Sequence, residues 1–233
     1  MNDHIVTSYD DELKELRSIV SRMGGLAADQ LQGAMKALQE DNIELALQVR
    51  AGDKELDQLD RTAEEAAIGV FARRAPVAND LREVVCALKI TGMIERIGDY
   101  AKNIAKRTEA MHGNSSVPVP HTLDAMASTA YKMIQDVMDA HAHRNAESAM
   151  EIWERDEALD NLHNAAHQQI LTQMADAPNY VGPYTHFLMI AKNLERIGDQ
   201  TTNIAEQIYF TTTGLRLEEA RPKHDLTSQT LVE

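Results

Sequence analysis

The residues best suited to chemistry in this sequence are pairs of carboxylates spaced four residues apart. The motif ERIGD pairs Glu95 with Asp99 and recurs unchanged as Glu195 with Asp199. Four residues span about one helical turn, so both acids of a pair lie on one face of a helix. Carboxylate oxygens are hard ligands that suit divalent or trivalent cations. A solvated helix face is the plainer interpretation of either motif alone.

A second acidic pair precedes each ERIGD motif, and hairpin geometry predicts that the pairs meet. Asp57 lies 19 residues before Pro76, and Glu95 lies 19 residues after it. If Pro76 marks the turn between two antiparallel helices, these two acids face each other. The second copy allows the same reasoning. The sequence therefore predicts two four-carboxylate metal sites: Asp53, Asp57, Glu95 and Asp99 in the first copy, and Asp156, Asp160, Glu195 and Asp199 in the second.

Such clusters need positive charge, because four converging carboxylates repel one another unless a cation is bound or some acids are protonated. Bridging carboxylates can hold one metal ion or more. The alternative source of charge is an ion pair between helices, from Arg61, Arg96, Arg196 or lysines. Asn103 and Asn203, one turn beyond each ERIGD motif, are candidates for peripheral ligands or, with more weight, for hydrogen-bond partners that hold the carboxylates.

The second copy also carries two histidines, His163 and His167, where the first has Asp60 and Glu64. On the face of the second acidic pair they would soften the site and favour zinc. A position at the protein surface is the commoner explanation for such histidines.

Proline positions leave room for long helices that would hold these acids. The composition, with 43% hydrophobic and only 4% aromatic residues, favours helix over strand. Proline is absent from residues 1–75, 77–117, 121–177 and 184–221, so helices can run long there. Asn42 is expected to cap a helix that ends at Gly52. Further helices are expected from Asp53 to the Pro76 turn and over residues 77–111.

An internal duplication organises the chain. Residues 95–105 (ERIGDYAKNIA) and 195–205 (ERIGDQTTNIA) are identical at 8 of 11 positions. Matching Glu, Gly, Asp and Asn together exceeds what amphipathic helices share by chance, so we infer two similar helical bundles. The expected division is a first bundle at 1–112, a linker at 113–120, a second bundle at 121–213 and a flexible tail at 214–233.

Charge and apolar content exclude several classes of protein. The net charge of −14 opposes nucleic-acid binding. The longest runs without Asp, Glu, Lys or Arg are 15 residues, too short to span a bilayer. The start, MNDHIVTSYDDEL, does not have the pattern of a signal peptide. The single cysteine, Cys86, lies in the apolar run VVCAL and is expected to be a buried structural thiol. A cytoplasmic setting is expected.

The sequence matches the motifs of known enzyme classes poorly. A ferritin-type oxidase needs two Glu-x-x-His elements, and only Glu109 with His112 has that spacing, at a helix end. No nucleophile with a base and no Gly-rich phosphate loop is apparent. Gly98 and Gly198 lie inside helices and are expected to allow close packing. These observations favour a protein that is not an enzyme.

Three segments resemble the PhoU family of phosphate-transport regulators: RMGGLA, APVANDLREVVCALKITGMIERIGDYAKNIA and LERIGDQTTNIAEQ. The resemblance covers nearly the whole chain. It departs at Ala75, where the family usually has Gln, and at PNYVGPYTHF in the second copy. It implies an all-α protein of two similar three-helix bundles that commonly forms a homodimer.

The same resemblance implies a cytoplasmic accessory of the phosphate-specific ABC transporter. Such proteins link the transporter's ATP-binding subunit to a membrane sensor histidine kinase and repress the phosphate-starvation response when phosphate is plentiful. Some members bind iron or zinc clusters on E/D-x-x-x-D motifs, which points to the eight carboxylates above, with magnesium or manganese as further candidates. The expected function is a non-enzymatic adaptor. The alternatives are a metal-dependent enzyme, a metal-storage bundle, or a structural module with ion-paired acids.

Overall fold

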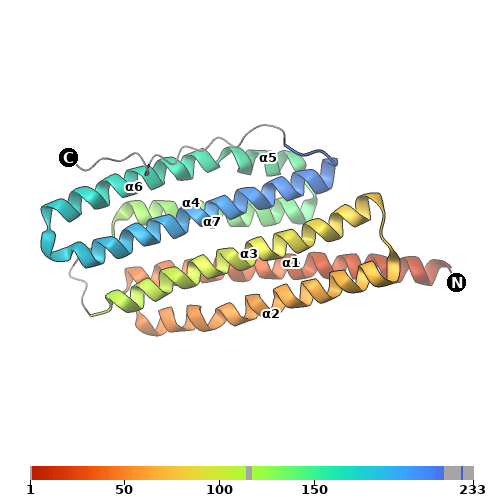
Figure 1. The fold of residues 1–233 in the computed structure, drawn as a ribbon, viewed down its shortest axis with the longest axis horizontal. Coiled ribbons are helices and arrows are strands. Elements are labelled where there is room, and N and C mark those ends of the chain that lie inside the picture. Colours follow the sequence, from red (N-terminus) through yellow and green to blue (C-terminus); the bar gives the residue numbers. More distant parts are fainter. Residues whose placement is uncertain (1, 114–116, 218–226, 228–233) are drawn as a thin grey trace.

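Long proline-free stretches of the chain fold into long helices. The computed structural model describes residues 2–113, 117–217 and 227, and these residues contain helices but no strand. The expected all-α class is confirmed (Figure 1). The elements are α1 (Asn2–Gln39), α2 (Ile43–Arg74), α3 (Ala78–Met111), α4 (His121–His143), α5 (Ala146–Glu154), α6 (Asp156–Asp176), the 3-10 helix η1 (Pro178–Tyr180) and α7 (Val181–Thr213).

Asparagine side chains start the second helix of each repeat. The Oδ1 of Asn42 accepts a hydrogen bond from the backbone N–H of Leu45 at 3.0 Å. Asn145 accepts one from the backbone N–H of Ser148 at 3.1 Å. Each bond satisfies a donor that the first helical turn leaves without a partner, a contribution of about 1 kcal/mol.

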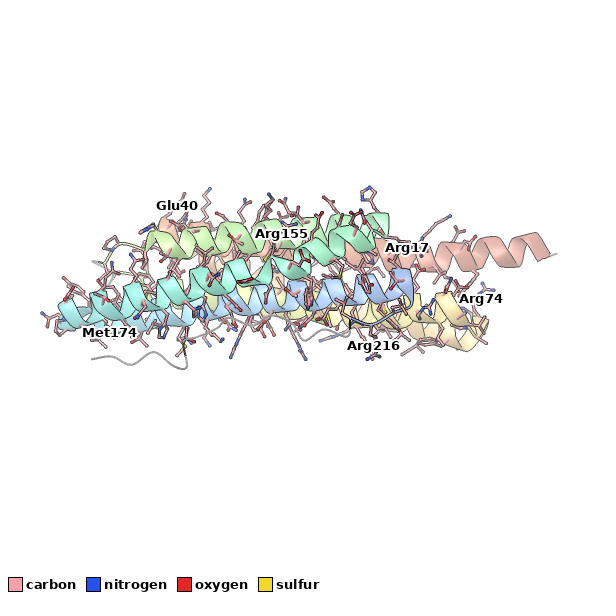
Figure 2. The ribbon with its side chains drawn as sticks, turned by 90° about the horizontal axis from the view of Figure 1, so that it is seen from above. Arg17, Glu40, Arg74, Arg155, Met174 and Arg216 are labelled. Atoms are coloured by element: carbon pink, nitrogen blue, oxygen red, sulfur yellow. The ribbon has the colours of Figure 1, made fainter. Side chains whose placement is uncertain are left out.

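The expected helix end at Gly52 is wrong, because α2 continues through this residue to Arg74. Glycine inside a helix costs about 1 kcal/mol relative to alanine. Buried neighbours such as Val49 and Leu56 hold the helix against the core on both sides of Gly52, and their packing offsets that cost. The break occurs in the second repeat instead, at Arg155 between α5 and α6 (Figure 2).

The helices form two sets of three, as predicted, with α5 and α6 together taking the place of α2. In the first set α1, α2 and α3 pack on one another, and in the second α5 and α6 pack on α4 and α7. The sets meet through α3 with α7 and α1 with α4 (Figure 1). Their buried side chains form one continuous hydrophobic core. The domain limits stay a prediction, and residues 114–116 of the linker and most of the tail lie outside the described residues.

Cys86 belongs to this buried interior, with 1% of its surface exposed, which confirms the structural thiol. Its Sγ lies 3.9 Å from Oε1 of Gln207, so the thiol contacts α7 from α3. Among the described helices, none combines the length and the apolar character that crossing a membrane requires.

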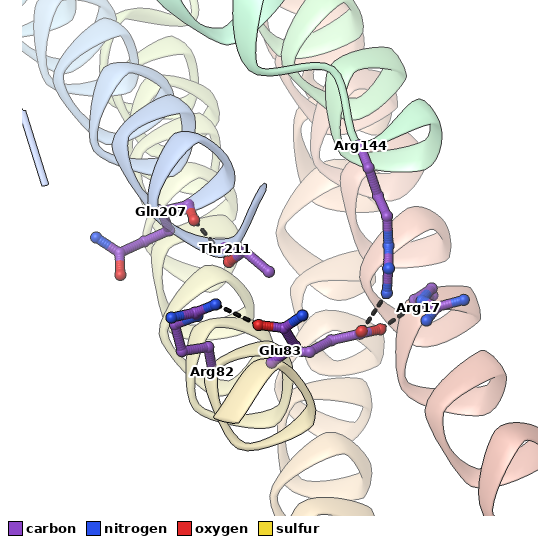
Figure 3. Close-up of polar contacts among 7 residues, drawn as sticks. Arg17, Arg82, Glu83, Arg144, Gln207 and Thr211 are labelled. Carbon is purple, nitrogen blue, oxygen red and sulfur yellow. Dashed lines mark hydrogen bonds and ion pairs between the residues drawn. The ribbon is translucent and has the colours of Figure 1, made fainter. Parts of the chain in front are cut away.

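A carboxylate joins the two repeats at one end of the bundle. Glu83 of α3 accepts hydrogen bonds from Arg17 of α1 and from Arg144 at the end of α4 (Figure 3). Burial raises the pKa of Glu83, but the hydrogen bonds and charges of the two arginines outweigh it and hold the pKa below its usual value. The ion pairs therefore connect three helices from both halves of the duplication.

His141 lies beside this junction and lines a cavity of about 30 Å³ with Glu83 and Cys86. Its Nδ1 is buried and has no hydrogen-bond partner. Burial lowers the pKa of His141 to about 4. The negative charge of Glu83 acts against this lowering, and the positive charges of Arg17 and Arg144 add to it. The folded protein thus holds this imidazole in its neutral form.

We expect His141→Gln to remove much of the loss of stability on acidification from pH 7 to pH 5. An unfolded histidine binds a proton as the pH falls through its pKa of about 6.5, while folded His141 stays neutral until about pH 4. Protonation therefore favours the unfolded chain, by about 2 kcal/mol at pH 5. Denaturant unfolding at both pH values measures this loss. His143→Gln, which changes an exposed histidine of the same helix, should keep the wild-type loss. An unchanged loss in His141→Gln would contradict the assignment.

Candidate metal sites in two acidic clusters

The α2–α3 hairpin places the acids of the first cluster (Asp53, Asp57, Glu95 and Asp99) near enough for the three aspartates to act electrostatically on Glu95. Burial raises the pKa of Glu95, and the negative charges of Asp99, Asp57, Asp60 and Asp53 raise it further. These charges act on Glu95 from both helices, so the aspartates of the hairpin lie within electrostatic reach of Glu95. Asp53 is 6% exposed, although it carries a carboxylate.

A lysine supplies positive charge to this cluster. The Nζ of Lys102 donates to Asp53 of α2 and, at 2.7 Å, to Oδ1 of Asp99 one turn earlier on α3. Burial lowers the pKa of Lys102, but the hydrogen bonds to the two aspartates and their charges outweigh it and raise the pKa above its usual value. Among the arginines considered from the sequence, Arg196 instead lies over the ring of Tyr100, 5.9 Å from its centroid.

Close packing at Gly98 places polar oxygens over the middle of α3. A Cβ on Gly98 would lie 2.3 Å from Cδ1 of Leu56, 3.0 Å from Oε1 of Gln30 and 3.7 Å from Oδ1 of Asp53. The expectation that this glycine allows close helix contact is confirmed. Gln30 of α1 is 7% exposed, and its Oε1 has no hydrogen-bond partner. A buried amide oxygen without a partner is uncommon in folded proteins.

The second cluster (Asp156, Asp160, Glu195 and Asp199) is more deeply buried. Asp156, Asp160 and Glu195 are 2%, 4% and 6% exposed. The Oγ1 of Thr202 lies 3.2 Å from Oδ1 of Asp156 and 3.0 Å from the backbone oxygen of Gly198, and these two acceptors compete for its single proton. Nζ of Lys192 lies 2.9 Å from Oε2 of Glu195. Asp156 is also the first residue of α6, where the helix dipole favours negative charge.

His163 is buried at the same face of α6, with 2% of its surface exposed. The interpretation of this residue as a surface histidine is therefore wrong. Its ring centroid lies 6.4 Å from that of His167 one turn later. A nitrogen-bearing side chain thus stands on the helix that carries Asp156 and Asp160, at a position where the first repeat has Asp60.

The kinds of side chain in the two clusters suit a metal ion, but their positions do not. Carboxylates, a buried amide oxygen and an imidazole are all known metal ligands. Within the described residues, however, no three His, Cys, Asp or Glu side chains are arranged to hold an ion together. In the first cluster the ammonium of Lys102 lies against two of the predicted ligands. Metal binding at these residues thus stays a prediction and requires side chains to move.

The Glu-x-x-His pair lies in other contacts. Glu109 accepts two hydrogen bonds from Nη1 of Arg50, at 2.7 and 2.6 Å. Nδ1 of His112 lies 3.1 Å from Oδ1 of Asp41. Both residues tie the end of α3 to α2 and to the preceding turn. This use of the pair gives no support to a ferritin-type centre.

Two residues beside the first cluster, Lys102 and Gln30, were not identified from the sequence. Lys102 had a visible signal, because it is one of the three positions that differ between ERIGDYAKNIA and ERIGDQTTNIA. Gln30 had none, since it comes from a helix outside the hairpin that carries the acids. The expected role of Asn103 is not seen, because its side chain lies on an exposed position of α3.

Gly98→Ala and Gly92→Ala should have opposite effects on stability. Both glycines lie in α3, and alanine improves helix propensity at each by up to about 1 kcal/mol. The new methyl group meets nothing within 4 Å at Gly92, but it overlaps the fully buried Leu56 at Gly98. Overpacking of this kind costs about 1 to 3 kcal/mol. Urea unfolding of the two variants measures the difference, and equal stabilities would show that Gly98 is not needed for close packing.

Both repeats of the chain are similar to known proteins. The model of the PhoU domain matches residues 20–108 and again residues 123–208. A phosphate-specific transport system accessory protein PhoU homolog from Zymomonas mobilis is 42% identical over 224 residues, which cover 96% of this chain and 94% of that protein. The protein of the same name from Rhizobium meliloti is 41% identical, over 97% of this chain and 95% of its own length.

Solved structures share the architecture. The crystal structure of PhoU from Pseudomonas aeruginosa superposes with a TM-score of 0.85 at 31% identity, over 89% of this chain and all of that one. The phosphate transport system regulatory protein PhoU from Streptococcus pneumoniae superposes with a TM-score of 0.84 at 26% identity, over 91% of this chain and all of that one. With both of its repeats matched and about 40% identity over nearly its full length, the chain belongs to the PhoU family of phosphate-transport accessory proteins.

Proposed function

We propose that this protein regulates phosphate uptake as a non-enzymatic adaptor in the cytoplasm. Its partners are the ATP-binding subunit of the phosphate ABC transporter and a membrane sensor histidine kinase, and it represses the phosphate-starvation response when phosphate is plentiful. The observation that carries this proposal is the full-length similarity to accessory proteins of the phosphate-specific transport system. A homodimer is the proposed working form.

The surface of the bundle supports a role in binding other proteins. Exposed apolar side chains gather at both hairpin tips, with Val77 (73% exposed) and Leu81 beside the α2–α3 turn and Tyr180 and Val181 beside the α6–α7 turn. The two tips lie at opposite ends of the molecule (Figure 1). Exposed apolar groups that cluster are typical of contact surfaces. Two such ends suit a protein that touches two partners.

The acidic clusters are the proposed metal-binding part of this regulator. Iron or zinc is the first candidate, and magnesium or manganese also suits the oxygen ligands. A bound ion would fix the register of each hairpin or bridge the protein to a partner. The residues that would hold it are Asp53, Asp57, Glu95 and Asp99 in the first cluster and Asp156, Asp160, Glu195 and Asp199 in the second.

Affinity purification from cells grown in high and in low phosphate, with and without a chelator, tests the adaptor function. We expect the ATP-binding subunit and the kinase to co-purify in high phosphate, and the chelator to weaken their binding. Asp99→Ala with Asp199→Ala should have the same effect as the chelator, since it removes one carboxylate from each cluster. Mass spectrometry of the bound proteins gives the measurement.

Glu44→Ala with Glu147→Ala is the matched control. These exposed acids occupy equivalent positions of the two repeats, so the change in charge is the same. Retained partner binding in the Asp99 and Asp199 variant would remove the proposed role of metal. Failure to recover either partner would overturn the adaptor function, and metal-dependent turnover of a substrate would favour an enzyme.

A further inference from the structure

We propose that the seam between α3 and α7 is a docking surface for an acidic helix of a partner protein. This surface carries a basic band, which consists of Lys89, Arg96 and Arg107 of α3 and Arg196 of α7. The inference rests on the proposed adaptor function and adds the chemistry by which a partner is recognised. It concerns the length of the bundle between the two hairpin tips.

The helices α3 and α7 lie side by side and run antiparallel (Figure 1). The thiol of Cys86 contacts α7 near one end of the seam. In the middle, Arg196 of α7 lies over the ring of Tyr100 of α3. Toward the other end, burial lowers the pKa of His186 on α7, and the charge of Arg107 on α3 lowers it further. The seam therefore joins the two repeats along much of both helices.

Helical spacing aligns the cations of α3 on one face of that helix. At 100° per residue, Lys89, Arg96 and Arg107 fall within an arc of about 20°, and Tyr100 and Asn103 widen it to about 60°. The acids of α3 lie at other angles, so this arc contains no carboxylate. Lys89 and Arg96 are exposed. The face is thus basic and polar along about five turns of the helix.

The cations of the band also lack acidic partners inside the protein. Other basic side chains, such as Arg17 and Lys102, form ion pairs with carboxylates. In the part of the chain that the structure describes, no cation of the band forms an ion pair. The whole chain has a net charge of −14, so the band is a local basic region on an acidic protein. Such a region attracts a partner that presents carboxylates.

The spacing and the neighbours of the cations favour a protein helix over a chain of phosphates. Lys89 and Arg96 are about 10 Å apart along the helix axis, which matches acids at seven-residue intervals on a helix packed along the seam. Met189 of α7 is 48% exposed and adds apolar surface beside the half-buried Tyr100. The acids of the two ERIGD motifs border the band and repel a polyanion that extends beyond it.

Charge reversal tests the inference with the full-length protein, the purified ATP-binding subunit and the sensor kinase reconstituted in nanodiscs. Lys89→Glu with Arg96→Glu should weaken the binding of the partner that carries the acidic helix, on the order of tenfold or more. The salt dependence of that binding should also fall, because fewer opposite charges meet. Biolayer interferometry at several salt concentrations gives both quantities.

Lys54→Glu with Arg61→Glu is the matched control. These exposed cations of α2 have the same charges and the same seven-residue spacing, so affinity should stay at the wild-type value. Lys89→Gln with Arg96→Gln serves if circular dichroism shows that the reversed variant does not fold. Carbodiimide cross-linking joins a lysine amine to a carboxylate with loss of water. A cross-link from Lys89 to an acid on a helix of the partner is the expected result.

Wild-type affinity of a folded Lys89 and Arg96 variant for both partners would overturn the inference and leave the adaptor function intact. A cross-link from Lys89 to a second copy of the chain, with loss of self-association in the variant, would assign the band to a homodimer instead. Binding of inorganic polyphosphate that only the band variant loses, with partner binding unchanged, would assign it to a polyanion. A wild-type protein that binds neither partner would overturn the adaptor function and this inference with it.

Discussion

Carboxylates that pack between helices need a positive charge or a hydrogen-bond donor at the same depth, because an uncompensated charge in the interior is costly. Both halves of this protein place four acids in a helical hairpin, and each half meets the requirement with different groups. In the first, the ammonium of Lys102 links the two helices. In the second, the ammonium of Lys192 lies against Glu195, and the hydroxyl of Thr202 and the start of α6 lie beside Asp156. Duplication kept the acids and changed their partners.

Much of the fold could be predicted because its signals are local. Proline spacing located the long helices, and the distances of Asp57 and Glu95 from Pro76 predicted that these two acids lie within electrostatic reach. A helix break was wrongly predicted at Gly52, because the packing of Val49 and Leu56 is a tertiary effect that propensity does not include. His163 was assigned to the surface for the same reason, since its burial depends on helices far away in the sequence.

The charged partners of the site were harder to predict than the acids. Several basic side chains near the ERIGD motifs had a suitable charge, and only side-chain reach in three dimensions separates Lys102 from Arg196. Gln30 depends on the register of α1 against the α2–α3 hairpin, which no motif encodes. Family membership identifies the acidic motif and the architecture, but the compensation of its charge belongs to this chain.

The break at Arg155 has a mechanical consequence. In the first repeat, α2 is one rod of 32 residues, so a displacement at the α2–α3 tip is carried along an uninterrupted ladder of hydrogen bonds. In the second repeat, α5 and α6 are two rods of 9 and 21 residues. That ladder is interrupted beside Asp156, where the ion pair of Arg155 with Asp136 ties the break to α4. A displacement at the α6–α7 tip therefore has no single continuous helix to follow, although both ends of the molecule arose from the same unit.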